Sequence, residues 1–215
     1  MKKLVLASLA LTCAASVFAQ GTVVLNTRLT GTVVTHVYGP KAGAPGFSQI
    51  GNGATDTVAG ATDWTGFTAI SGASYLGALL SAPGQNAAEA SLVLNAQTQS
   101  FRTGTAAGQI PQTTYTLGNV AKDNATGATL QLFAWDNTTG SYSSSAAAWT
   151  AWKAGTIAGG VSSVFNVNAT IGGDLNAAPV AAGVNSFNLY SVPEPSTMAL
   201  AGLGAAALLI FRRRK

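Results

Sequence analysis

The 215-residue sequence offers few side chains for acid–base or nucleophilic chemistry. It holds one histidine, His36, and seven acidic residues that are scattered along the chain. Two carboxylates about 5–10 Å apart could hydrolyse a glycosidic bond, but the spacing of these residues gives such a pair no support. No zinc-protease or serine-hydrolase motif is present. We therefore predict no catalytic residues, no cofactor and no enzyme activity.

Aromatic side chains could do a different kind of chemistry, because flat rings stack on the faces of sugars. Most of the tryptophans and tyrosines stand in segments with the pattern of strands or helices, where rings pack in the core. Trp64 and Tyr142 stand instead in polar stretches that contain Gly or Ser, so we expect these two rings to be exposed. They are the candidate sugar contacts of an alternative function, an extracellular carbohydrate-binding β-sandwich module.

One short pattern occurs twice, as Asp-Asn-x-Thr-Gly at residues 123–127 and 136–140. Asp and Asn accept hydrogen bonds from nearby backbone groups, and Gly adopts positive φ easily, so both copies predict turns at the two ends of one strand. The alternative is a calcium site, since Asp and Asn oxygens also bind this ion. The chain lacks the ligand spacing of an EF-hand, and we predict no metal site.

The basic residues are concentrated at the two ends of the chain. The formal net charge is +4, but six of the eleven basic residues lie among the first three and last four positions. Residues 20–196 carry five basic residues against seven acidic ones, a net charge of −2. This distribution excludes a nucleic-acid partner, which would require a basic surface on the folded body.

The first 19 residues have the pattern of a secretory signal peptide. Lys2 and Lys3 precede an apolar run from Leu4 to about Phe18, and the small or β-branched residues Val17 and Ala19 stand ahead of a cleavage point. We expect cleavage between Ala19 and Gln20. The only cysteine, Cys13, lies inside this segment, so the exported chain would contain neither a thiol nor a disulfide.

The last 24 residues combine a short motif, an apolar segment and a basic end. Pro193, Glu194 and Pro195 precede an apolar segment at 197–211, and the chain closes with a basic cluster that would hold this end in the cytoplasm. The fourteen residues 198–211 span only about 21 Å as a helix, against a hydrocarbon core of about 30 Å. The segment is therefore a marginal transmembrane helix that could anchor the chain in the cytoplasmic membrane, transiently or as an ordinary tail anchor. The membrane-stop residues are Arg212, Arg213, Arg214 and Lys215.

This C-terminal arrangement resembles the PEP-CTERM sorting signal, which an exosortase handles in Gram-negative bacteria. The resemblance implies that residues 193–195 are the recognition motif of a membrane-embedded processing enzyme and that the chain is its substrate. It also implies association with the cell surface, an exopolysaccharide or the extracellular matrix of a biofilm. Residues 115–168 resemble more loosely the body of PEP-CTERM proteins from Verrucomicrobia-like bacteria, a group that brings no catalytic residues. The sequence thus describes an exported protein that is anchored in the inner membrane and then moves to the surface or the matrix.

The sequence of the body, residues 20–191, predicts an all-β domain. Short runs of β-branched and aromatic residues alternate with Gly, Asn, Asp and Thr, which favours a β-sandwich or a jelly-roll-like fold. One short helix is predicted at 145–154, with Trp149 and Trp152 on the face that packs on a sheet. Residues 74–81 fit a helix or a strand equally well, and residues 39–66 are expected to form long loops. Strands are predicted at 22–25, 32–38, 91–95, 113–117, 129–135, 161–169 and 184–190.

Overall fold

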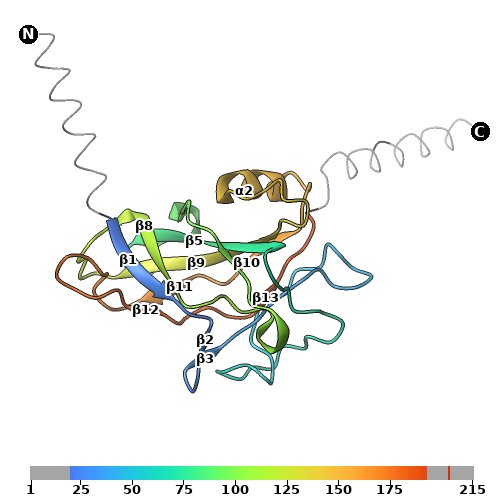
Figure 1. Ribbon diagram of the computed structural model, residues 1–215, viewed down its shortest axis with the longest axis horizontal. Coiled ribbons are helices and arrows are strands. Elements are labelled where there is room, and N and C mark those ends of the chain that lie inside the picture. Colours follow the sequence, from blue (N-terminus) through green and yellow to red (C-terminus); the bar gives the residue numbers. More distant parts are fainter. Residues whose placement is uncertain (1–19, 193–202, 204–215) are drawn as a thin grey trace, which may run out of the picture.

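The computed structural model describes residues 20–192, together with Leu203. The predicted signal peptide and nearly all of the sorting segment, including Pro193, Glu194, Pro195 and the basic end 212–215, therefore lie outside the described residues. Within the described part, strands in several sheets and a single short α-helix make up the regular structure, which confirms the all-β prediction (Figure 1).

The largest sheet is built around two long antiparallel strands, β5 and β9. They pair without interruption from Tyr75 opposite Asp136 to Pro83 opposite Ala128. Four short strands extend this pair, two beside each long strand. The six strands are β5 (Tyr75–Pro83), β6 (Val93–Leu94), β7 (Gln99–Ser100), β9 (Ala128–Asp136), β10 (Gly159–Val161) and β11 (Phe165–Val167).

A second sheet faces one side of the first. Its central strand β1 pairs antiparallel with β8 and parallel with β12. The main core takes buried side chains from both sheets, such as Val23 of β1, Tyr115 of β8 and Leu132 of β9, so the two sheets form a sandwich. The remaining strands form two small pairs, and two 3₁₀ turns complete the fold. These elements are β1 (Gln20–Leu25), β8 (Thr113–Ala121), β12 (Val180–Ala181), β2 (Arg28–Leu29), β3 (Val33–Val34), β4 (Val37–Tyr38), β13 (Phe187–Asn188), η2 (Glu89–Ser91) and η3 (Gly104–Ala106).

Strand β9 is buried on both faces, and its alternation follows the predicted pattern. Leu130, Leu132 and Ala134 point into the main core. Phe133 and Trp135 point to the opposite face, where they belong to a second apolar cluster under the helix. A strand with period-two alternation can serve two cores at once because successive side chains leave opposite faces of the sheet.

The second cluster is closed by α2 (Ser145–Lys153), which lies across the large sheet (Figure 1). The hydroxyl of Ser144 caps the helix by accepting a hydrogen bond from the Ala147 amide at 3.3 Å. Gly155, at φ +78°, ends it as a left-handed residue. Trp152 is fully buried against Phe133, with 5.4 Å between ring centroids. The predicted helix and its tryptophan face are confirmed.

The ambiguous segment 74–81 is the strand β5. Its Leu and Ala residues favour a helix when taken alone. Two features of the surroundings decide otherwise: β9 offers a complete ladder of hydrogen bonds, and both faces of β5 are covered by apolar side chains. Tertiary pairing therefore overrides local propensity.

Four predicted strands are shorter or interrupted in the structure. The run 32–38 splits into β3 and β4 because the amide of His36 donates to the hydroxyl of Ser186 instead of a strand partner. The run 161–169 splits into β10 and β11, which both pair with β9. The run 184–190 keeps only β13, and the run 91–95 keeps only β6.

Candidate functional site

Residues 190–192 are held against the body by backbone hydrogen bonds and apolar packing. Tyr190 exchanges two backbone hydrogen bonds with Gly159, at 2.8 and 3.1 Å, and the Ser191 amide donates to the carbonyl of Pro45 at 2.8 Å. The half-buried Val192 packs on the second apolar cluster. The predicted motif thus begins one residue after the folded body, without an intervening linker.

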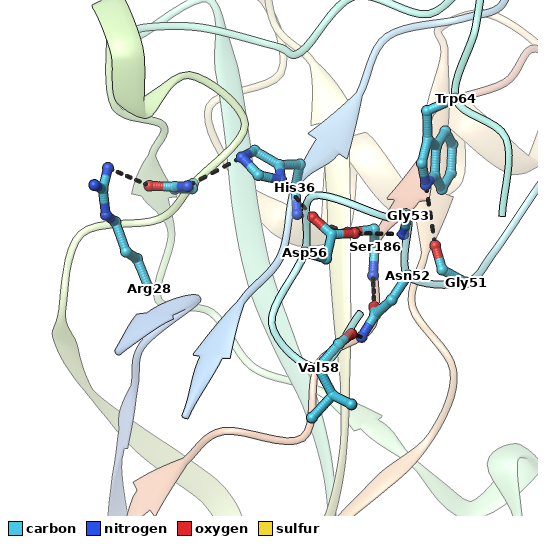
Figure 2. Close-up of polar contacts among 10 residues, drawn as sticks. Arg28, His36, Gly51, Asn52, Gly53, Asp56, Val58, Trp64 and Ser186 are labelled. Atoms are coloured by element: carbon cyan, nitrogen blue, oxygen red, sulfur yellow. Dashed lines mark hydrogen bonds and ion pairs between the residues drawn. The ribbon is translucent and has the colours of Figure 1, made fainter. Parts of the chain in front are cut away.

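A polar network around Asp56 brings together His36, Ser186 and Gln109 (Figure 2). The Nδ1 atom of His36 lies 2.7 Å from Oδ1 of Asp56. The other carboxylate oxygen accepts hydrogen bonds from the hydroxyl of Ser186 and the amide of Gly53, both at 2.7 Å. The Asp56 side chain has no exposed surface, so all of its partners come from the protein.

A Ser, a His and an Asp in contact could form a catalytic triad, but their hydrogen bonds differ from those of a triad. A catalytic serine must donate its proton to the histidine that acts as its base. Here Ser186 donates to Asp56 and accepts the backbone amide of His36, at 2.8 Å. The imidazole Nε2 faces the amide of Gln109 at 3.1 Å, and Ser186 is fully buried. The network therefore has no base positioned for the serine, and it ties the long loop to the sheets.

The ionisation of Asp56 follows from these contacts. Burial raises its pKa, but the hydrogen bonds from His36, Gly53 and Ser186 outweigh burial and leave the pKa below the ordinary value of 3.8. Asp56 is therefore a buried carboxylate that stays charged at neutral pH. Its side-chain partners His36 and Ser186 lie 20 and 130 positions away along the chain, and no sequence pattern marks them as partners.

A second polar residue, Asn52, closes the same loop from the other side. Its side-chain nitrogen donates to the carbonyl of Val58 at 2.8 Å, and its oxygen accepts the amide of Ser186 at 3.0 Å (Figure 2). The region 39–66 therefore forms a long loop, as predicted, and side-chain hydrogen bonds of Asn52 and Asp56 hold it in place.

Trp64, a predicted sugar contact, is half-buried rather than exposed. Its ring stacks on Tyr38 with 4.3 Å between centroids, and its Nε1 donates to the carbonyl of Gly51 at 3.1 Å. Burial, followed by the charge of Asp56, raises the pKa of Tyr38 to about 12. The indole also borders an open hollow of about 310 Å³. The residues that line this hollow are Tyr38, Gly53, Ala54, Thr55, Thr62, Asp63, Trp64 and Thr65.

Tyr142, the other predicted sugar contact, is half-buried in a different place. It packs on the second apolar cluster, and its backbone carbonyl accepts the Nε1 hydrogen of Trp135 at 2.8 Å. Both rings are thus half-buried, Trp64 against Tyr38 and Tyr142 against the second apolar cluster, and a sugar contact at either stays a prediction. A hollow of about 510 Å³ lies beside α2, and Tyr142 is not part of its lining. Its lining residues are Leu80, Glu89, Ala90, Leu92, Gln131, Trp149, Lys153 and Val161.

The repeated Asp-Asn-x-Thr-Gly pattern forms turns at the two ends of β9, as predicted. Gly127 and Gly140 have φ near +73° and +72°. The carboxylate of Asp123 accepts the amides of residues 174, 175 and 176 at 2.9–3.3 Å, and its hydrogen bonds, the one from the Asn176 side chain first, lower its pKa. Among residues 20–192, no three His, Cys, Asp or Glu side chains are grouped so that they could hold a metal ion.

Comparison with known proteins addresses the C-terminal segment. Residues 191–215 match the family model described as the PEP-CTERM protein-sorting motif. No curated protein and no solved structure matches the sequence. None of the helices in the described residues is both long and apolar enough to cross a membrane.

Proposed function

Because the chain carries a PEP-CTERM protein-sorting signal at residues 191–215, we propose that it is an exported structural or interaction protein delivered to the cell surface or the extracellular matrix. The signal peptide is removed between Ala19 and Gln20, and segment 197–211 holds the chain in the cytoplasmic membrane. An exosortase-type enzyme then recognises Pro193, Glu194 and Pro195 and processes the chain there. The observation that carries this proposal is the match to the sorting motif.

The boundaries of the folded body are compatible with both processing steps. Strand β1 begins at Gln20, so cleavage after Ala19 would leave the strand and its buried residues Val23 and Leu25 intact. At the other end, the backbone is held through Ser191, so loss of the tail would remove no residue of a strand. Processing at either end therefore leaves the sandwich complete.

The charged side chains of the body support a role as cargo rather than as a catalyst. Asp56 fixes the long loop, and Asp123 holds the turn at 174–176. Lys122 forms an ion pair with Asp174, and Glu89 accepts a hydrogen bond from Gln131 at 2.8 Å. Each of these groups already has a structural partner.

The proposal is tested by comparing the native host with an otherwise identical strain that lacks exosortase activity. In the native host we expect a mature protein that begins at Gln20, has lost its C-terminal tail and has left the inner membrane. In the strain without the enzyme we expect the same N-terminus but a full-length tail and a membrane location. Intact mass and cell fractionation measure both. Identical mass and location in the two strains would refute processing by this class of enzyme.

A second candidate function, binding of an exopolysaccharide, is favoured by the hollow beside Trp64. A tryptophan ring, a carboxylate and several threonine hydroxyls meet there, which are the groups that contact the apolar faces and hydroxyls of sugars. If this hollow binds the polymer, Trp64→Ala should weaken retention of the processed protein on host polysaccharide about tenfold. Tyr142→Ala, outside the hollow, should leave retention unchanged. Equal retention of the wild type and both variants would remove this candidate.

A further inference from the structure

We propose that the surface formed by Lys41, Phe47 and Phe67, together with the exposed Ile50 three positions after Phe47, contacts the lipid headgroups while the tail anchors the chain; it is here called the Phe47 patch. This inference rests on the proposed function, since it requires the anchored state. It adds an orientation of the folded body on the membrane before processing.

The Phe47 patch is joined to the last described residues of the chain. Asn188 donates through its side chain to the carbonyl of Phe47 at 2.8 Å and accepts the amide of Gln49 at 2.7 Å. Ile50 forms a bridge with Phe187, and Ser191 donates to Pro45 at 2.8 Å. In Figure 1 the blue loop that follows β4 accordingly lies beside the orange-red end of the described chain. The backbone that carries the patch is therefore fixed to the backbone that carries the tail.

The connection from this point to the membrane is short. Only residues 193–196 separate Val192 from the apolar segment at 197–211. Four extended residues span at most about 14 Å, while one headgroup layer is about 5–8 Å thick. The surface around Val192 must therefore lie at or close to the headgroups for as long as the tail is inserted.

The composition of the Phe47 patch suits that location. Phe47 and Ile50 are 43% and 45% exposed, and Phe67 lies 6.3 Å from Phe47 between ring centroids. The ammonium of Lys41 lies 4.8 Å from the Phe47 centroid and 5.4 Å from that of Phe67. Exposed Phe and aliphatic side chains beside a lysine are typical of surfaces that lie in the membrane interface, where the apolar groups enter the boundary and the ammonium meets lipid phosphates.

The charges of the body and of the neighbouring Asp63 indicate which side chains of the patch contribute most to the lipid contact. The body, residues 20–191, carries five basic and six acidic residues, a net charge of −1, so its remaining surface offers anionic lipids little attraction. Hydrogen bonds from Thr65, followed by the charge of Lys41, lower the pKa of the nearby carboxylate of Asp63, which moderates the positive charge of the patch. We therefore expect the apolar rings to contribute more to the contact than the single lysine.

The test uses the chain that remains after signal-peptide removal, residues 20–215, in vesicles of phosphatidylethanolamine and phosphatidylglycerol. This chain has no native cysteine, so Ile50→Cys and Leu175→Cys can each carry one fluorophore. Leu175 is the control because it is 87% exposed and apolar, and it lies in the turn held by Asp123. Quenching by headgroup-labelled lipid should be several-fold stronger at position 50 than at position 175.

Two further results decide the inference. Adding Phe47→Ser to the labelled Ile50→Cys chain should reduce the quenching towards that of the control, while flotation with the vesicles should not change. Equal quenching at positions 50 and 175 in a chain that floats would overturn the patch but leave the anchor intact. A chain that does not float would overturn both the anchor and the patch. If the fluorophore at position 50 becomes shielded only when the processing enzyme is added, the patch contacts a protein partner. This result would contradict the lipid contact.

Discussion

Replacing Pro193 and Glu194 with alanine is expected to keep the exported protein at its full C-terminal length and in the inner-membrane fraction. Proline fixes φ and disfavours a helix before it, so the Pro-Glu-Pro sequence predicts an extended segment in which an enzyme can bind Glu194. Alanine at both positions removes one rigid residue and the only acidic side chain among residues 193–215. A loss of about 1.4 kcal/mol of binding free energy between the enzyme and the motif slows processing about tenfold. We expect a larger decrease in the rate for this double variant.

Intact mass and fractionation in the native host measure this effect. Ser196→Ala is the matched control, because it changes a neighbouring residue outside the motif and should be processed as the wild type is. If the Pro193→Ala/Glu194→Ala variant loses its tail at the wild-type rate, the motif is not what the enzyme recognises. If the wild type also keeps its tail, the segment is an ordinary membrane anchor.

The second large effect concerns Asp56→Asn, which should destabilise the processed protein by about 3 kcal/mol. The carboxylate accepts three hydrogen bonds with no help from water: one from His36, one from Gly53 and one from Ser186. An amide accepts at one oxygen only, so its NH₂ group must face at least one of these donors. If it faces His36, the imidazole proton must move to Nε2, which lies opposite the side-chain nitrogen of Gln109, so two donors meet in either arrangement. Urea unfolding followed by tryptophan fluorescence measures the change.

The same variant should alter the acid dependence of stability. Because the pKa of Asp56 is lower in the folded than in the unfolded protein, its charge stabilises the fold fully above its ordinary pKa of 3.8. This stabilisation is lost as the pH falls through the lower, folded pKa. The free energy of unfolding of the wild type should therefore drop below about pH 4, and that of Asp56→Asn should drop less steeply. Some dependence should remain, since the pKa values of Asp63 and Asp123 are also lowered.

Asp63→Asn is the control for this experiment. Asp63 also accepts a hydrogen bond, from the amide of Thr65 at 2.9 Å, but it is exposed to water. Water can replace its lost interactions, so its substitution should change stability little. Equal effects of Asp56→Asn and Asp63→Asn would contradict the structural role assigned to the buried network.

The free edge of β8 shows how distant segments complete the fold. Gln97 accepts the amide of Thr116 at 3.2 Å and donates to the carbonyl of Thr114 at 2.8 Å, while Asn95 accepts the amide of Gly118 at 2.8 Å. These side-chain amides occupy positions that a further strand would take, and so they shield the edge from pairing with another chain. Such cover requires no charged residue, which agrees with a body that has few of them.

The sequence alone was sufficient wherever the information is local. The sorting motif is a linear pattern, so its recognition requires no folded structure. Strands β1, β8 and β9 and helix α2 follow from side-chain periodicity, capping and turn residues within a few positions. The two Asp-Asn-x-Thr-Gly turns were predictable for the same reason.

The tertiary structure alone decided the features that depend on distant residues. β5 is a strand because β9, some fifty positions later, pairs with its full length. Asp56 meets Ser186 across 130 positions, and the burial of Trp64 depends on the position of Tyr38. Neither local propensity nor spacing encodes such contacts, because they form only when separate segments pack and exclude water from the space between them.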